Sequence, residues 1–322
     1  MTLHPMTLRT KIVATVVASL LLIGAAVGWA LTRQEPPEVA VDSTISLRTP
    51  GVLVRDTVTG QLALIKPDGS RTQAKVACSR AYAAGGRGIC LRRDPVTPNT
   101  FELAVLDEEL NVVDKRPING VPTRARVSAD GRMLSWTVFV SGDSYLDSGF
   151  STRTGILDLE TGSLVNTIED FTLDDRRLLV DANLWGVSFA DDDNTFYATM
   201  STGKHLYLVQ GSVATESLQI LADGVECPSL SPDGTRLVYK KRLPDLTWQL
   251  WVLDLATLVR TQLTETQNVD DQAAWRDDQT IMYGKTVETT GQVDLWTVPA
   301  DGSGLPTKLA DGAESPAILL AG

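Results

Sequence analysis

The sequence contains few of the residues from which most active sites are built. Its 322 residues include only two histidines, His4 and His205, and three cysteines. It has no G-x-S-x-G motif of the serine hydrolases, no cysteine–histidine group with zinc-site spacing and no glycine-rich phosphate loop. A Ser-His-Asp triad would have to use His205, and no neighbouring residue supports this. These absences argue against the enzyme classes that such motifs define and favour a non-catalytic protein.

Basic residues are also outnumbered. Lys and Arg total 29 against 40 Asp and Glu, so the formal net charge is −11. Nucleic-acid affinity comes mainly from cationic side chains that neutralise phosphates. The charge balance therefore argues against a nucleic-acid ligand, and equally against polybasic binding to anionic lipid. A hydrophobic fraction of 43% is normal for a globular chain with a core, and the length allows one large or two ordinary domains.

The one long hydrophobic run lies near the N-terminus. Residues 12–31 carry no charge over 20 positions, which is the length of a bilayer-spanning helix. Arg9 and Lys11 precede the run and predict that the short tail stays in the cytoplasm while the rest of the chain is exported. The predicted order is a cytoplasmic tail (1–11), a transmembrane signal anchor (12–32), a linker (33–47) and an extracytoplasmic body (48–322).

A cleaved signal peptide is the alternative interpretation of this run. Gly28 and Ala30 are small residues of the kind that signal peptidase accepts. The apolar stretch is longer than the usual signal-peptide core, which favours an uncleaved anchor in the cytoplasmic membrane. Cleavage would instead produce a secreted protein, and both interpretations place the body outside the cytoplasm.

Two of the cysteines are placed to form a disulfide. Cys78 and Cys90 flank a predicted hairpin that turns at Gly85-Gly86, and their positions are symmetric about Ala84. We expect them to face each other across the two strands, because export favours disulfide formation. The alternative is a pair of buried thiols that pack as small hydrophobic side chains. Cys227 has no obvious partner and is expected in the core.

Helical periodicity is nearly absent after the linker. Short β-branched and aromatic runs alternate with Gly, Asp and Pro turns, a pattern typical of all-β proteins. Six segments share one shape, with alternating apolar positions followed by a turn and a further short strand. They are 61–69, 102–110, 154–162, 205–213, 249–257 and 294–302. Their spacing of about 45 residues is the period of four-stranded propeller blades.

A turn phrase precedes most of these segments. The clearest copy is Ser231-Pro232-Asp233-Gly234, and blurred copies occur at 128–131, 190–193 and 276–278. Asp accepts hydrogen bonds from its own backbone, and Gly tolerates the positive φ that such turns need. Each copy is followed by a strand, so the phrase is interpreted as the hairpin turn of one blade.

The six units predict a six-bladed β-propeller, with seven blades as the alternative. The first unit lacks an innermost strand, because the body begins at GVLVRD (51–56), which matches a second strand. The C-terminal segment 312–320 resembles 224–231, which is an innermost strand of the repeat. We therefore expect strand 314–320 to complete the first blade and close the ring, which removes its exposed edges.

The turn at 231–234, the aromatic strand after it and LWVLDL (250–255) resemble the TolB-type, WD-repeat-like propellers. The resemblance covers residues 48–322 and is best in the last two blades. It implies the fold but no activity, because propellers serve as enzymes, receptors and scaffolds alike. TolB proteins also carry an α/β domain before the propeller and act with a lipoprotein partner. This chain has a hydrophobic segment in place of that domain, so the partner is not carried over.

The predicted binding site lies where the innermost strands begin. Superposing the repeats brings Glu226, Asp271 and Glu314 to equivalent positions, with Trp185, Thr123 and Cys78 at the same place in the other blades. Three carboxylates converging at one channel mouth would raise one another's pKa and favour a cation or a basic side chain. A divalent cation is the only cofactor that this arrangement suggests. The alternative is a solvated rim without a ligand.

Two long connections are expected on the same face as this mouth. Segment 141–153 carries Tyr145, Phe150 and Arg153, and segment 169–185 carries Phe171. Long loops on a rigid scaffold are common sites of binding. We assign binding to 141–153 and packing between blades to 169–185.

Three hypotheses for function follow from this pattern. The first is a membrane-anchored, monomeric propeller that binds a protein or cell-envelope ligand through its loop-rich channel face. The second is a metal-assisted small-molecule hydrolase that uses Glu226, Asp271 and Glu314 as ligands. The third is a structural spacer with no tight ligand.

Overall fold

The structure is a computed structural model that describes residues 19, 22, 45–97, 99–140 and 151–320. Contacts divide the chain into two units, Met1–Ala40 and Val41–Gly322. Apart from Ser19 and Leu22, the predicted span 12–32 lies outside the described residues. Within the described ranges no helix has the length and apolar character needed to cross a membrane. The anchor therefore stays a prediction.

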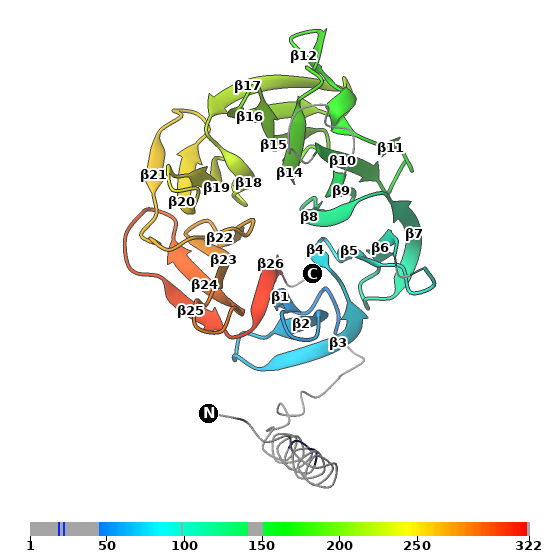
Figure 1. Cartoon of the computed structure of the whole chain (residues 1–322), viewed down its shortest axis with the longest axis vertical. Helices are drawn as coiled ribbons and strands as arrows, with labels where there is room; N and C mark the ends of the chain where they lie inside the picture. The colour runs from blue at the N-terminus through cyan, green and yellow to red at the C-terminus, as the bar shows by residue number, and fades with distance from the viewer. Residues whose placement is uncertain (1–18, 20–21, 23–44, 98, 141–150, 321–322) are drawn as a thin grey trace, which may run out of the picture. The chain divides into compact units, whose positions relative to one another are not determined.

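The second unit consists of six antiparallel sheets that stand in a ring (Figure 1). From the axis outward, blade one contains β26 (Ala313–Leu319), β1 (Gly51–Asp56), β2 (Gln61–Ile65) and β3 (Arg71–Ala77). Blade two contains β4 (Arg80–Ala84), β5 (Arg87–Arg93), β6 (Phe101–Leu106) and β7 (Val112–Ile118). Blade three contains β8 (Val121–Val127), β9 (Met133–Val140), β10 (Ser151–Asp158) and β11 (Leu164–Val165).

Blade four is larger than the others and has six strands. They are β14 (Asn183–Phe189), β15 (Thr195–Thr202), β16 (His205–Ser212), β17 (Ser217–Asp223), β12 (Thr172–Leu173) and β13 (Arg176–Arg177). Blade five contains β18 (Glu226–Leu230), β19 (Arg236–Arg242), β20 (Trp248–Asp254) and β21 (Arg260–Gln262). Blade six contains β22 (Ala274–Asp277), β23 (Thr280–Thr286), β24 (Val293–Pro299) and β25 (Thr307–Ala310). The prediction of an all-β, six-bladed propeller is confirmed.

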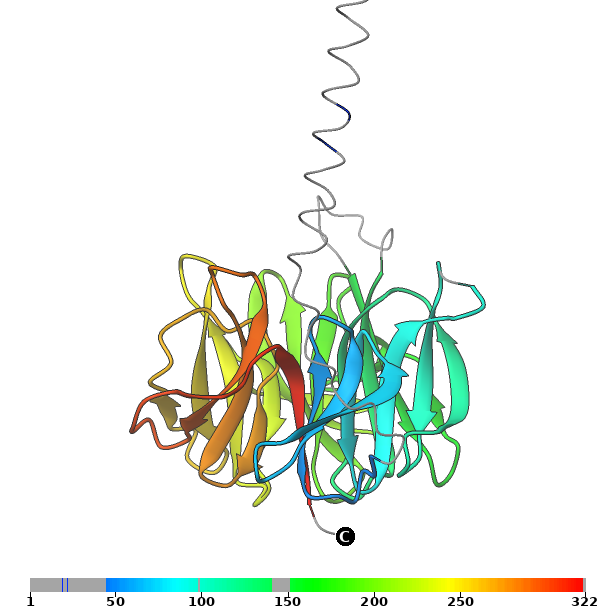
Figure 2. The same ribbon diagram turned by 90° about the horizontal axis from the view of Figure 1, so that it is seen from below.

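The ring is closed by the last strand of the chain. β26 pairs antiparallel with β1, so that Gly51 lies opposite Leu319 and Asp56 opposite Ala313. Blade one is thus built from both ends of the propeller unit, and β1 gains a partner on its inner edge. The view from the side shows β26 (red) running to the lower face (Figure 2).

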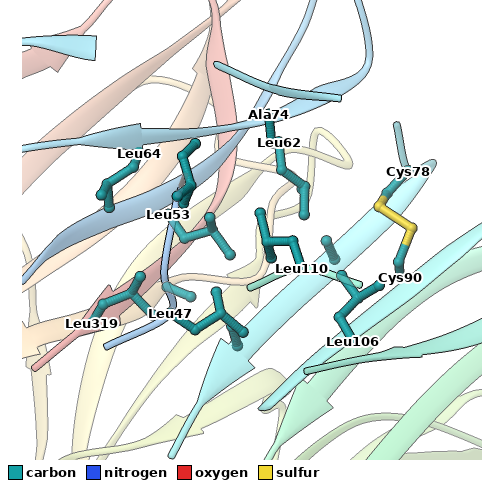
Figure 3. Close-up of a cluster of buried hydrophobic side chains, with 14 of the residues drawn as sticks. Leu47, Leu53, Leu62, Leu64, Ala74, Cys78, Cys90, Leu106, Leu110 and Leu319 are labelled. Atoms are coloured by element: carbon teal, nitrogen blue, oxygen red, sulfur yellow. A yellow bond between two sulfur atoms is a disulfide. The ribbon is translucent and has the colours of Figure 1, made fainter. Parts of the chain in front are cut away.

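The hydrophobic core is divided among the blade interfaces. Six clusters of buried side chains each join two neighbouring blades, so every interface in the ring has its own core. The cluster between blades one and two includes Leu47, Leu53, Leu64 and Leu319 (Figure 3). Because neighbouring blades cover both faces of each sheet, its strands carry continuous buried runs such as residues 62–65 of β2.

The long connection 169–185 serves packing, as the sequence predicts. It begins within the 3-10 helix η1 (Ile168–Asp170), and Phe171 is 2% exposed in the core between blades three and four. Its two short strands add a hairpin to the outer edge of blade four, where β12 runs parallel to β17. Leu179 is the exception to the packing interpretation, because it is 67% exposed.

The disulfide between Cys78 and Cys90 is present and lies beside the core of blades one and two (Figure 3). The expected register of its hairpin is wrong. Gly85 and Gly86 both have positive φ and form a two-residue turn, so Ala84 pairs with Arg87 and Ala81 lies opposite Cys90. Cys78 therefore precedes the hairpin instead of pairing within it. Cys227 is free and buried, as predicted.

Removing the disulfide should lower the stability of the propeller substantially. The bridge closes a short loop, with a sequence separation of 12. The chain-entropy model assigns about 3 kcal/mol to a loop of this length. The double variant Cys78→Ala, Cys90→Ala should therefore lose about 3 kcal/mol in denaturant unfolding. Reduced wild-type protein should show a similar loss, and a loss under about 1 kcal/mol in both would contradict this.

The repeated turn phrase is stabilised by its aspartate. The Asp233 carboxylate accepts hydrogen bonds from the Ser231 hydroxyl at 2.5 Å and from the Thr235 N–H at 3.0 Å. Gly234 has a φ of +69° and donates its N–H to the Ser231 carbonyl. Asp130 in the turn 128–131 makes equivalent contacts with Ser128 and the Arg132 N–H. The phrase is structural, as the sequence indicates.

Asp233→Ala should lower the melting temperature by about 2–4 °C at neutral pH, because the turn loses its acceptor. The hydrogen bond from Ser231, followed by those from Thr235, lowers the pKa of Asp233 from 3.8 to about 2. A depressed folded-state pKa contributes stability above the unfolded value and loses it as the pH falls through the folded value. The difference in melting temperature between wild type and Asp233→Ala should therefore become smaller as the pH falls from 3.8 to about 2, as measured by circular dichroism melts. A difference independent of pH would contradict this explanation.

Candidate functional site

The predicted channel mouth lies at the face where the innermost strands begin, here named the mouth face. β8 starts opposite the end of β9, with Val121 paired to Phe139, so β9 ends and β10 begins at this face. Tyr145 and Phe150 fall between these two strands and lie outside the described residues. Arg153 is exposed on β10 and pairs with Val138 near the same face.

The predicted equivalence of the strand starts is reproduced in the backbone. Trp185, Glu226 and Glu314 each precede a residue with positive φ, at a bulge in the innermost strand. The three bulge residues are Gly186 at +69°, Cys227 at +50° and Ser315 at +53°. A bulge redirects the side chains beside it. For these three of the six superposed positions, the repeats of the sequence therefore correspond in the backbone.

Glu314 lies between two arginines. Its carboxylate accepts a hydrogen bond from Arg55 Nη1 at 2.6 Å and another from Arg80 Nη1 at 3.2 Å. Arg55 also donates through Nε to the Cys78 carbonyl at 2.6 Å. The Glu314 side chain is 15% exposed. This group joins the innermost strands of blades one and two at the mouth.

Glu226 is buried behind an aromatic side chain. It is 4% exposed and accepts a hydrogen bond from Trp248 Nε1 at 2.9 Å, and Arg242 Nε lies 3.4 Å from the same carboxylate oxygen. Arg242 also lies over the Trp248 ring, 5.1 Å from its centroid. Lys240 contacts the same ring and forms an ion pair with Asp270 at 2.7 Å. The network links blade five to the loop that enters blade six.

Asp271 lies beside an arginine that belongs to blade three. Burial lowers the pKa of Arg124, but Cys227 and then Asp271 and Asp270 raise it, and the net shift is upward. The Arg124 Nε donates to Cys227 Sγ at 3.3 Å. The Asp271 carboxylate also accepts the Ser315 N–H at 3.3 Å. Arg124 thus brings positive charge to a position where the sequence predicts only acidic groups.

The three carboxylates do not form the single acidic cluster that the sequence predicts. Arginines contact Glu226 and Glu314, and Arg124 lines the same narrow part of the channel as Asp271, so the mouth carries charges of both signs. In the described part of the chain, no group of three or more His, Cys, Asp or Glu side chains is arranged to hold a metal ion. Thr123 and Cys78 occupy the same level of the channel and contribute no charge there. The threonine side chain is neutral, and Cys78 is held in the disulfide.

A cavity that the sequence analysis missed opens at the opposite face, here named the tail face. Its volume is about 510 Å³. Four positions after each mouth residue, the innermost strands place a mostly apolar side chain in its wall. These residues are Tyr82, Val127, Phe189, Leu230, Trp275 and Ile318. The same superposition of repeats would have found this ring, had it been continued along the strands.

The two ends of the channel are separated by a constriction. The free space there is only about 20 Å³, and its lining includes Arg80, Arg124 and Arg126. Arg126 also lines the tail-face cavity. β1 begins at this face, since Gly51 lies opposite Leu319. The propeller therefore presents a charged mouth on one face and an apolar cavity on the other.

No protein-family model and no curated protein matches the sequence. Among solved structures, TolB from Acinetobacter baumannii is similar, with a TM-score of 0.59 and 16% identity, over 85% of this chain and 67% of that one. A chain of the nidogen/laminin complex has a TM-score of 0.57 and 12% identity, over 84% and 98%. A puromycin-hydrolyzing peptidase from Mycobacterium tuberculosis has a TM-score of 0.51 and 14% identity, over 81% and 43%. At such identities the likeness concerns the fold: the chain has a TolB-like, six-bladed β-propeller fold.

Proposed function

We propose that the propeller is a non-catalytic module that binds a protein partner through its mouth face. The observation that supports this most directly is the mixed surface around the mouth. Arg80, Arg242 and Glu314 provide charges of both signs on rigid strands. Val121 and Phe139 are 56% and 38% exposed beside them on blade three. Protein interfaces combine exposed apolar side chains with a polar rim whose charges select the partner.

The fold comparison is consistent with this proposal. One of the similar structures is a chain of the nidogen/laminin complex. Another is a peptidase, so the fold alone does not choose between binding and catalysis. The hydrolase hypothesis required Glu226, Asp271 and Glu314 to act as metal ligands. Because Glu226 and Glu314 already contact arginines, this arrangement favours recognition of a partner over metal binding.

We also propose that the propeller lies on the extracytoplasmic side of the cytoplasmic membrane, held there by residues 12–32. The support comes from the uncharged run and from Arg9 and Lys11 before it. The disulfide adds to this support, because such bonds persist in oxidising compartments. Protease added to intact spheroplasts should digest the propeller, and sequencing the mature N-terminus should return the residues of the 1–11 tail. A mature N-terminus after Ala30 would replace the anchor with a cleaved signal peptide.

Site-specific photo-crosslinking in intact cells tests the binding proposal. A photoreactive amino acid is placed at Phe139 of the full-length chain, and a matched one is placed at Val259, which is exposed at the tail end of blade five. We expect one defined protein adduct from position 139 and none from position 259. Arg153→Ala and Arg242→Ala should reduce the yield about tenfold, the effect of losing an interface residue worth over 1 kcal/mol.

Alanine substitutions at the other residues of the predicted binding site show how far the site extends. Alanine changes at Tyr145, Phe150, Trp185, Glu226, Asp271 and Glu314 test them one at a time. Melting temperatures of the purified variants distinguish lost binding from lost folding, which is essential for the buried Glu226. Adduct formation that is equal from both crosslinker positions, or unchanged by every one of these variants, would refute the assignment of the mouth face.

A further inference from the structure

The tail-face cavity contains a buried arginine whose charge is not balanced by the protein. Arg126 lines this cavity and is 5% exposed. Within the described residues it has no ion pair. Its Nη2 donates a long hydrogen bond of 3.4 Å to the Ala273 carbonyl, and its Nε has no hydrogen-bond partner. A guanidinium keeps its charge at every physiological pH and carries five N–H donors. Burying such a group without an anion is costly.

The surroundings of Arg126 compensate for this cost only in part. Its guanidinium carbon lies 4.3 Å from the centroid of the Tyr82 ring, a cation–π contact. By contrast, Arg55 and Arg80 in the same channel share the carboxylate of Glu314. Arg126 is therefore a preformed site for an anion, since a carboxylate would supply the acceptors that its donors lack.

The cavity wall determines the rest of the ligand. Phe189, Trp275 and Val127 are each less than 9% exposed, and with Tyr82 and Ile318 they form an apolar wall around the space. The volume of about 510 Å³ falls within the range of sites for small molecules. A ligand that reached Arg126 would have to place a hydrocarbon or aromatic body against this wall.

The rim excludes a second negative charge. Asp130, Asp191 and Asp193 line the outer part of the cavity. Arg48 lies there too, but it forms an ion pair with Glu108. Arg132 pairs with Asp158 and also lies 3.9 Å from the Asp193 carboxylate, so among the described residues Asp130 and Asp191 are the rim aspartates without an ion pair. An anionic group at the outer end of the ligand would be repelled by these aspartates, whereas a neutral end would not be repelled.

From these contacts we infer that the tail-face cavity binds an amphipathic monocarboxylate, with its carboxylate on Arg126 and its apolar body inside the ring of the six innermost strands. This site lies at the other end of the channel from the mouth face, and neither proposal depends on the other. The wall is contributed by all six blades, so a bound ligand would also connect them and raise the melting temperature.

Four probes that share a ten-carbon chain test the inference on the purified full-length protein. They are decanoate, decanol, decyltrimethylammonium and decanedioate, which differ in end-group charge at equal chain length. Calorimetry below the micellar concentration should give one decanoate site per chain. Decanol and decanedioate should bind at least about tenfold more weakly, and the cation should show no site. Equal affinity for decanol and decanoate, or no binding of decanoate, would overturn the inference.

Two further measurements assign the contact to Arg126. Arg126→Met should lose at least about tenfold in decanoate affinity while leaving decanol unchanged, and Arg260→Met on the outer strand β21 serves as the matched control. The second uses the unaltered protein: decanoate labelled with ¹³C at its carboxyl carbon should titrate at lower pH when bound than when free, because the guanidinium favours the anion. An unshifted titration would overturn the inference even if Arg126→Met failed to fold.

Discussion

A chain that ends at Glu314, and so lacks most of β26, should not form a cooperatively folded propeller. β26 provides the innermost strand of blade one, and Ala317 and Leu319 are 0% and 3% exposed in the core. Its loss leaves β1 with an unpaired inner edge and removes the strand by which the chain leaving blade six joins blade one. The expected loss is on the order of 5–10 kcal/mol, comparable with the whole stability of a typical domain. Circular dichroism melts should then show no sharp transition.

A matched truncation makes this result specific to the closing strand. A chain ending at Leu320 retains all of β26 and should melt as the intact protein does. Adding a synthetic peptide of residues 313–320 to the shorter chain should restore part of the transition, because the missing strand pairs with β1 from outside. A chain ending at Glu314 that melted as sharply and as high as the intact protein would show that the ring does not depend on its closure.

The repeat, the turns and the closure were predictable because each depends on local sequence. Alternating apolar residues specify a strand, and a Ser-x-Asp-Gly phrase specifies its turn, wherever the strand lies in the ring. Because equivalent positions recur in every blade, an unmatched first strand and an extra last one imply that they pair. The same repetition placed Trp185, Glu226 and Glu314 at corresponding bulges.

The electrostatics of the mouth were not predictable in this way, because they depend on contacts between different repeats. Glu314 accepts a hydrogen bond from Arg55, which lies 259 positions away in the chain. Asp271, just before blade six, lines the same constriction as Arg124 of blade three. No feature of one repeat indicates which side chain of another will point towards it. The hairpin of β12 and β13 was missed for a related reason, since strands of two residues show no periodicity.

The register of the hairpin near Cys90 was predicted wrongly, although the error in the centre of pairing is small. The disulfide was predicted correctly, yet the strands pair about a centre between Gly85 and Gly86 instead of about Ala84. Two glycines in succession allow both central residues of a two-residue turn to take positive φ. The geometry of the turn therefore sets the register of the hairpin, and the symmetric spacing of the two cysteines about Ala84 does not.

Glu265→Ala should destabilise the propeller far more than Asp233→Ala does. Glu265 is 3% exposed and follows β21, in the connection from blade five to blade six. Its carboxylate accepts a hydrogen bond from Lys285 Nζ at 2.9 Å and one from the Tyr283 hydroxyl at 2.7 Å. Lys285 is 7% exposed, so the variant leaves a buried positive charge whose nearest compensation is the Trp296 ring at 3.6 Å. Breaking a buried pair in this way costs about 3–5 kcal/mol.

The pH dependence separates this ion pair from simple packing. Burial raises the pKa of Glu265, but the hydrogen bonds from Lys285 and Tyr283 outweigh it, so the pKa lies below its ordinary value of 4.5. A carboxylate with a depressed folded-state pKa stabilises the protein above its unfolded value and loses that contribution as the pH falls through the folded value. The stability difference between wild type and Glu265→Gln should therefore be largest near neutral pH and shrink below pH 4.5.

The double variant Glu265→Leu, Lys285→Met shows whether the stability lost in Glu265→Ala comes from the unpaired charge of Lys285 or from lost packing. Removing both charges leaves no unpaired buried ion, and such replacements are often neutral or stabilising. Denaturant unfolding should therefore place the double variant about 2 kcal/mol or more above Glu265→Ala in stability. Tyr283 provides an internal check, because the double variant also deprives its hydroxyl of an acceptor and so keeps part of the loss. If Glu265→Ala and the double variant were equally unstable, the loss would come from packing at this interface and the ion pair would contribute nothing measurable.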